Sequence, residues 1–93
     1  MTTNVYSYSD NKVYNAYYYV STHYWQGDDL ADLEGDQYDN LIDALDNYTA
    51  RCESIMYADT TQEDIELRLI IVDDNDTLIG ETALMSLTKQ RYY

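Results

Sequence analysis

Apolar and polar residues alternate along several stretches of the chain, which is the pattern of β-strands with one face against a core. The alternation is weak from Val5 to Tyr8, and Ser9 to Lys12 then form a predicted turn. The stretch from Val13 to Trp25 is rich in Tyr, Val and Thr and is long enough for a full strand. Both faces of this strand would be aromatic. We therefore expect a hairpin with one face on the core and the other face partly covered.

The most regular pattern in the chain predicts a helix. Residues 27–36 are predicted to be an acidic loop, and Asp36 stands where an N-cap residue belongs. From residue 37 to about residue 56, apolar residues recur at spacings of three and four, which is typical of an amphipathic helix. The predicted apolar stripe consists of Tyr38, Leu41, Ile42, Leu45, Tyr48, Cys52, Ile55 and Met56.

The last third of the chain returns to alternation. Ile65 to Val72 predicts a third strand, Asp73 to Asp76 a turn, and Thr77 to about Glu81 a fourth strand. Residues 82–90 fit either a short helix or a continuation of that strand. The resulting β-β-α-β-β order predicts an α+β fold, in which residues 1–93 form a single domain with one long amphipathic helix packed on an antiparallel sheet.

The charge of the chain restricts its partners. Eighteen Asp and Glu face five Lys and Arg among 93 residues, a net charge of −13. This balance argues against binding to nucleic acid or to an anionic membrane, because both depend on Lys and Arg. The sequence shows no signal-peptide pattern, and apolar runs such as Leu69 to Val72 are far shorter than the ~20 residues that span a bilayer, so we expect a soluble protein of the cytoplasm.

Aromatic composition is also unusual, with twelve Tyr and no Phe. Some of these tyrosines are expected to take the place of Phe in the core, and others to be available to a partner or to a second copy of the chain. The expected core tyrosines are Tyr14, Tyr18, Tyr38 and Tyr48, and the expected contact residues are Tyr17, Tyr19, Tyr24 and Trp25.

Patterns that would indicate an enzyme or a metal site do not fit. Cys52 is the one cysteine and falls on the helical stripe, which favours a core residue over a reactive thiolate. A calcium loop that began at Asp73 would place Leu78 where the motif requires glycine. His23 is the one histidine and stands among tyrosines. We therefore expect no catalytic activity, no bound metal and no cofactor.

A row of carboxylates is the most distinctive feature of the predicted helix. Asp36, Asp39, Asp43 and Asp46 follow at spacings of three, four and three, and Glu53 continues the row. On a helix this spacing places a carboxylate about every 5 Å along one face. The chain has no Lys or Arg between Lys12 and Arg51, so the row lacks the partners that usually stabilise exposed helices. A second acidic group lies within residues 59–81, and its position relative to the row stays open.

In size, charge, carboxylate row and neighbouring Tyr-rich strand, the chain resembles the small acidic inhibitors encoded by phages, the anti-CRISPR and anti-restriction proteins that imitate DNA. The resemblance implies a stoichiometric inhibitor that occupies the DNA- or PAM-binding site of a CRISPR effector. The expected partner-binding residues are Asp28, Asp29, Asp32, Glu34, Asp36, Asp39, Asp43, Asp46, Glu53, Tyr24 and Trp25. Three alternatives remain: an immunity protein or antitoxin that neutralises a basic nuclease toxin, an acidic phage assembly module that dimerises through its Tyr-rich sheet, and a charged face that only keeps the protein in solution.

Overall fold

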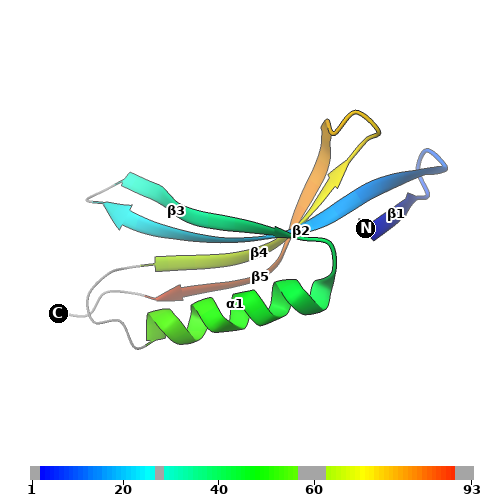
Figure 1. The fold of residues 1–93 in the computed structure, drawn as a ribbon. Helices are drawn as coiled ribbons and strands as arrows, with labels where there is room; N and C mark the ends of the chain where they lie inside the picture. The colour runs from blue at the N-terminus through cyan, green and yellow to red at the C-terminus, as the bar shows by residue number, and fades with distance from the viewer. Residues whose placement is uncertain (1–2, 27–28, 57–62, 90–93) are drawn as a thin grey trace.

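The computed structural model describes residues 3–26, 29–56 and 63–89, and it places one helix against one face of an antiparallel sheet (Figure 1). The elements are β1 (Thr3–Ser7), β2 (Lys12–Gln26), β3 (Asp29–Tyr38), α1 (Leu41–Met56), β4 (Glu63–Val72) and β5 (Leu78–Lys89). The predicted α+β fold class is confirmed, with one more strand than the sequence pattern indicated. The predicted hairpin, third strand and turn are also found, and residues 82–89 continue β5 as a strand.

Strand β2 organises the sheet because both of its edges are used. One edge pairs with β4, from Asn15 opposite Val72 to Tyr24 opposite Glu63. The other edge is shared: β1 pairs with residues 12–16 and β3 pairs with residues 18–26. Strand β5 pairs with β4 and lies at the border of the sheet. Helix α1 lies over β2 and β4 (Figure 1).

The predicted acidic loop at residues 27–36 is wrong, because Asp29–Tyr38 form strand β3. Asp and Gly disfavour strands, but pairing with β2 supplies backbone hydrogen bonds that override this preference. Gly35 shows how the two strands fit together. A Cβ atom on Gly35 would lie 1.9 Å from the Tyr19 hydroxyl oxygen, so the Tyr19 ring occupies the space that a side chain would need. A glycine that suggested a loop thus provides room for a ring from the neighbouring strand.

Helix α1 begins four residues later than predicted, and its N-cap is Asn40 rather than Asp36. The Asn40 Oδ1 accepts a hydrogen bond from the Asp43 backbone N–H at 2.9 Å, and the Asn40 carbonyl accepts one from the Ala44 N–H at 3.3 Å. The Asn40 Nδ2 also donates to the Asp43 carboxylate at 2.8 Å. Asp43 therefore lies in the first helical turn, where the helix dipole favours a negative charge.

This cap gives a direct test of where the helix starts. We expect Asn40→Ala to lower the free energy of unfolding by about 1 kcal/mol, because the Asp43 N–H loses its acceptor. Asn40→Ser should retain most of the stability, since serine caps helices about as well as asparagine does. Urea denaturation followed by circular dichroism measures both variants. An alanine variant as stable as the serine variant would contradict this cap.

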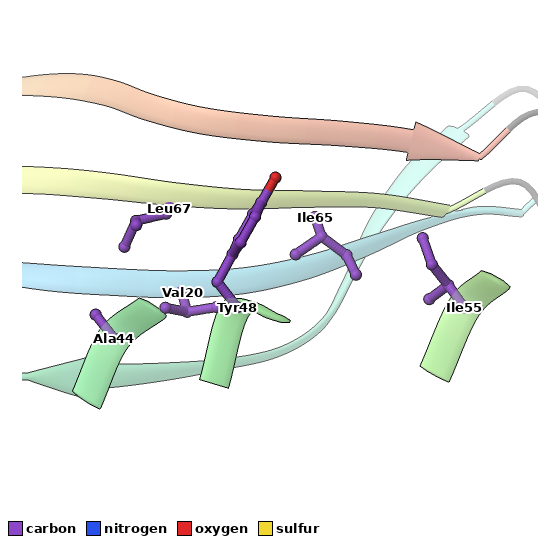
Figure 2. Packing of buried hydrophobic residues seen from close by; sticks show 6 residues of the cluster. All are labelled: Val20, Ala44, Tyr48, Ile55, Ile65 and Leu67. Atoms are coloured by element: carbon purple, nitrogen blue, oxygen red, sulfur yellow. The ribbon is translucent and has the colours of Figure 1, made fainter. Parts of the chain in front are cut away.

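The core lies between α1 and the centre of the sheet (Figure 2). Tyr48 and Ile55 reach from the helix toward the strands, where Val20, Ile65 and Leu67 are fully or almost fully buried. The residues packed around this cluster are Tyr18, Tyr38, Leu45, Cys52 and Leu87. Three of the four predicted core tyrosines are thus found at the core, and burial raises the pKa of the Cys52 thiol there.

Two details of the predicted core are wrong. Leu41, Ile42 and Met56 are exposed, because the buried stripe of α1 runs through Ala44, Tyr48, Arg51 and Ile55 instead. The first and last turns of the helix therefore turn these three apolar residues to solvent. Tyr14 lies outside the core, and its hydroxyl donates a hydrogen bond to the Asp10 carboxylate near the β1–β2 turn. This bond lowers the pKa of Asp10 and raises that of Tyr14.

The environment of Tyr48 makes the stability of the protein depend on pH in the alkaline range. Desolvation, together with a hydrogen bond to Cys52, raises the pKa of Tyr48 to about 12. In the unfolded chain a tyrosine loses its proton near pH ~10. The contribution of Tyr48 to stability is therefore complete below about pH 10 and is lost as the pH rises toward 12.

We expect wild-type protein to lose more stability than Tyr48→Phe between about pH 9 and about pH 11, because phenylalanine has no proton to lose. Denaturant unfolding at several pH values measures the two slopes. Tyr8→Phe, at a residue that is 88% exposed, is the matched control and should follow the wild type. Equal slopes for Tyr48→Phe and the wild type would contradict the assignment.

The segment between β4 and β5 is a turn, as predicted. The Asp73 Oδ1 accepts hydrogen bonds from the backbone N–H groups of Asn75 at 2.8 Å and Thr77 at 2.9 Å. Asp76 has a φ of 60°, a left-handed conformation that Asp and Asn tolerate better than most residues. The Asp73 carboxylate is thus used within the turn. Across the described ranges, no helix is long and apolar enough to cross a membrane.

Candidate partner-binding surface

The exposed face of α1 carries three carboxylates, from Asp43, Asp46 and Glu53. At 3.6 residues per turn they lie within about 80° of one another around the helix axis and span about 15 Å along it. Asp39 is exposed just before the helix begins. The predicted row is therefore only partly a helical row, because Asp36 and Asp39 precede α1. Asp43 also belongs to the N-terminal cap, where a negative charge is favourable. The row therefore destabilises the helix less than like charges in the middle of a helix would.

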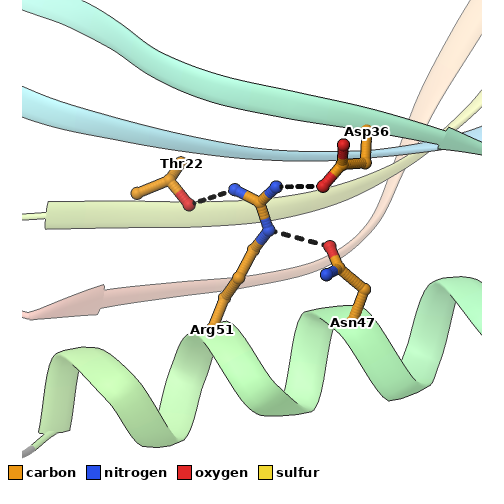
Figure 3. A network of polar contacts seen from close by, with 4 residues as sticks. All are labelled: Thr22, Asp36, Asn47 and Arg51. Atoms are coloured by element: carbon orange, nitrogen blue, oxygen red, sulfur yellow. Dashed lines mark hydrogen bonds and ion pairs between the residues drawn. The ribbon is translucent and has the colours of Figure 1, made fainter.

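Asp36 is not the helix N-cap that the sequence predicted, and its carboxylate is engaged in an ion pair. It lies on β3 opposite Val20, and its Oδ2 forms an ion pair with the Arg51 Nη2 at 2.7 Å (Figure 3). The Arg51 Nη1 donates to the Thr22 Oγ1 at 2.5 Å, and its Nε donates to the Asn47 Oδ1 at 2.8 Å. The Arg51 side chain is only 8% exposed, so its guanidinium links the helix to two strands. Asp36 thus balances a buried charge within the fold.

Sequence reasoning missed Arg51 as a buried residue. Its position follows Ala44 and Tyr48 at helical spacing and precedes Ile55 by four residues, which places it on the same face of the helix. A cation on an apolar stripe indicates a buried ion pair, and the acids of the preceding strand were the available partners. The place of Arg51 on the apolar stripe was therefore the sequence signal that could have identified its hydrogen bonds and ion pair.

Arg68 is also bound to carboxylates of its own chain. Its Nε donates to the Glu66 Oε2 at 2.5 Å, and its Nη1 lies 3.2 Å from the Glu81 Oε1. The hydrogen bond to Glu66 raises the pKa of Arg68. Both arginine side chains that the structure describes are therefore engaged by acids. Lys12, at the start of β2, is the exposed cation among the described side chains.

Part of the second acidic group lies away from the row on α1. Arg68, Glu66 and Glu81 form their ion pairs on the face of the sheet opposite the helix, and the β4–β5 turn with Asp74 extends away from α1 (Figure 1). Asp59, which also belongs to this group, lies outside the described residues. Among the described residues, negative charge is thus present at the β4–β5 hairpin as well as on the helix face.

The helix-free face of the sheet contains a shallow groove of about 460 Å³. Its lining residues are Tyr17, Tyr19, Ser21, His23, Arg68, Ile70, Val72, Asp76, Leu78 and Glu81. Tyr17 and Tyr19 were predicted to be available to a partner, and they lie on this face. The Ser21 Oγ lies 3.0 Å from the His23 Nε2. Because Ser21 is buried, its hydroxyl is shielded from solvent.

The remaining predicted contact residues are placed only by their backbone pairing. Asp29, Asp32 and Glu34 belong to β3 and pair with Gln26, His23 and Thr22 of β2. The side chains of these three acids, and those of Tyr24 and Trp25, lie outside the described part of the structure, as does Asp28. Comparisons with protein-family models, with curated proteins and with solved structures gave no match to this chain.

Proposed function

We propose that this protein is a stoichiometric inhibitor that imitates DNA, an anti-CRISPR protein whose acidic surface occupies the DNA- or PAM-binding site of a CRISPR effector. The observation that carries the proposal is the separation of charge. The arginines Arg51 and Arg68 are bound to carboxylates within the fold, whereas Asp43, Asp46 and Glu53 are exposed together on α1. A partner that approaches the helix therefore meets negative charge without an intervening cation from the same helix.

The chemistry of such a contact follows from what DNA-binding proteins offer. Their clefts present Arg and Lys that normally hold phosphates, and these side chains bind carboxylates through charge-assisted hydrogen bonds. A net charge of −13 also attracts a basic partner over several ångströms and speeds association, an effect that salt weakens. Binding of this kind needs no turnover and no cofactor. It competes with DNA because both ligands require the same cations.

A competition experiment tests the proposal. Tagged protein is used to capture partners from lysates of bacteria that carry CRISPR systems, and the captured complexes are challenged with excess duplex DNA that contains target and PAM. We expect a CRISPR effector that is captured at a 1:1 ratio and released by DNA. In the reverse order, an effector already bound to DNA should not bind the inhibitor.

Other results would point elsewhere. A basic nuclease toxin that remains bound in the presence of DNA would favour an immunity protein. An effector that binds the inhibitor and DNA at the same time would contradict mimicry.

A further inference from the structure

Strand β5 is an open edge of the sheet. It pairs with β4 along one side, and no strand in the described ranges pairs with its other side. Helix α1 packs mainly against β2 and β4 and less against β5, where Leu87 reaches the core. An uncovered edge of this length presents backbone hydrogen-bonding groups and side chains to any strand or surface that approaches.

Two β-bulges determine which side chains β5 presents. Leu67 pairs with Met85 and Arg68 pairs with Ala83, which leaves Leu84 as an extra residue in β5. In the same way the pairing of Ile71 with Gly80 and of Val72 with Leu78 leaves Ile79 as an extra residue. Bulges bend a strand and redirect side chains. The apolar residues exposed along the edge are Leu78 (57%), Ile79 (50%), Leu84 (44%) and Met85 (45%).

Charge distinguishes β5 from the rest of this acidic protein. Residues 77–88 contain Glu81 as their one acid, although the chain has 18. The Glu81 carboxylate is in turn paired with Arg68, at 3.2 Å. An edge with exposed apolar residues and almost no net charge is unusual in a chain of net charge −13. It offers a contact surface that does not depend on attraction between opposite charges.

We infer that β5 is the surface through which two copies of this chain associate. A basic partner gains most from the carboxylates on α1, whereas a second copy carries the same net charge and can approach closely only through a neutral surface. A two-fold axis beside β5 would bring Ile79 and Leu84 of one copy against the same strand of the other. This inference is independent of the proposed inhibitor function.

The dimer should be weak. The two bulges interrupt the edge, so side-chain contacts would replace a continuous ladder of hydrogen bonds. A contact of one strand with another is also smaller than the roughly 800 Å² per partner of a standard interface. We therefore expect a dissociation constant of about 10 to 100 µM. Salt should tighten the dimer because it screens the repulsion between the two negative bodies.

Sedimentation equilibrium from about 5 µM to about 500 µM tests this dimer at low and high salt. We expect a reversible monomer–dimer equilibrium that is several-fold tighter at high salt. Leu84→Glu should weaken it at least about tenfold, because two new carboxylates would face each other. Ile42→Glu is the matched control: it adds the same charge at an apolar residue that is 72% exposed on α1, and it should leave the dimer unchanged.

Two results of the sedimentation experiment would overturn the inferred dimer. A protein that stays monomeric at the highest concentration and in both salts overturns the inference, as does a dimer that Ile42→Glu weakens as much as Leu84→Glu does. If Leu84→Glu does not fold, amide hydrogen exchange on the wild type decides the question: β5 amides should exchange more slowly at high protein concentration, because the side-chain contact excludes water from the edge. The target complex has the opposite salt dependence, so failure of the dimer and failure of the proposed function can be distinguished.

Discussion

Arg51→Met is expected to lower the free energy of unfolding by about 2 kcal/mol, the largest change in stability among the variants considered. Methionine keeps an unbranched apolar stem and a similar helix propensity, so the change mainly removes the guanidinium. Thr22 is 5% exposed and would lose its buried donor, which costs about 1 to 3 kcal/mol. Asp36 is 54% exposed and can turn to water, which keeps the loss below that of a fully buried ion pair.

Two controls connect this loss to the network that Figure 3 draws. Asp36→Asn keeps an acceptor for the Arg51 guanidinium and should cost less than Arg51→Met. Thr22→Val combined with Arg51→Met should cost less than the sum of the two single changes, because each single change removes the same hydrogen bond. Urea denaturation with a constant m-value is the measurement. If Arg51→Met unfolds with the stability of the wild type, the buried guanidinium makes no net contribution.

The double variant Asp46→Lys with Glu53→Lys is expected to weaken the target complex about 100-fold, or about 2.7 kcal/mol. It reverses two charges on the exposed face of α1 without touching the Asn40 cap or the Arg51 network. Most of the change should appear at low salt, and the association rate should fall. Binding to the captured effector is measured by surface plasmon resonance at several salt concentrations.

A pair of single variants distinguishes the effect of where a charge lies from the effect of the net charge of the protein. Asp46→Lys and Asp74→Lys make the same substitution and bring the net charge from −13 to the same value. Asp74 lies on the β4–β5 turn, away from α1. Asp46→Lys should weaken the complex about tenfold and Asp74→Lys by much less. Equal effects would assign the attraction to net charge alone and exclude the helix face as the contact.

The parts of the fold that the sequence predicted are those in which the local pattern of residues agrees with the burial of their side chains. On β4, Ile65 and Leu67 alternate with polar neighbours and are buried, and on β2 the content of Tyr, Val and Thr indicated a long strand, so both central strands were identified. Strand β3 was missed because its acids and Gly35 have a low propensity for β-strands. Its position depends on the long edge of β2 and on the space beneath the Tyr19 ring, and neither is a local property of residues 29–38.

The candidate site was predicted in part for a similar reason. The acids of α1 are exposed as expected, since helical spacing determines which residues share a face. Asp36 was assigned to the same row because the start of the helix was placed too early. Asn40 and Asp36 are both good N-cap residues, and the choice between them depends on the pairing of β3 through Tyr38 with Tyr18. Tertiary contacts, and not local sequence, decided between the two.

The shared edge of β2 has a consequence for the order of events during folding. Strands β1 and β2, β2 and β3, and β4 and β5 are neighbours in sequence, so each of these hairpins closes a short loop and forms within microseconds. The β2–β4 pairing is the exception, because it joins the two halves of the chain across the helix. That single long-range closure is the slow step that contact order predicts. Until β2 and β4 pair, both central strands have open edges. Each chain carries a net charge of −13, and the repulsion between chains keeps those open edges apart.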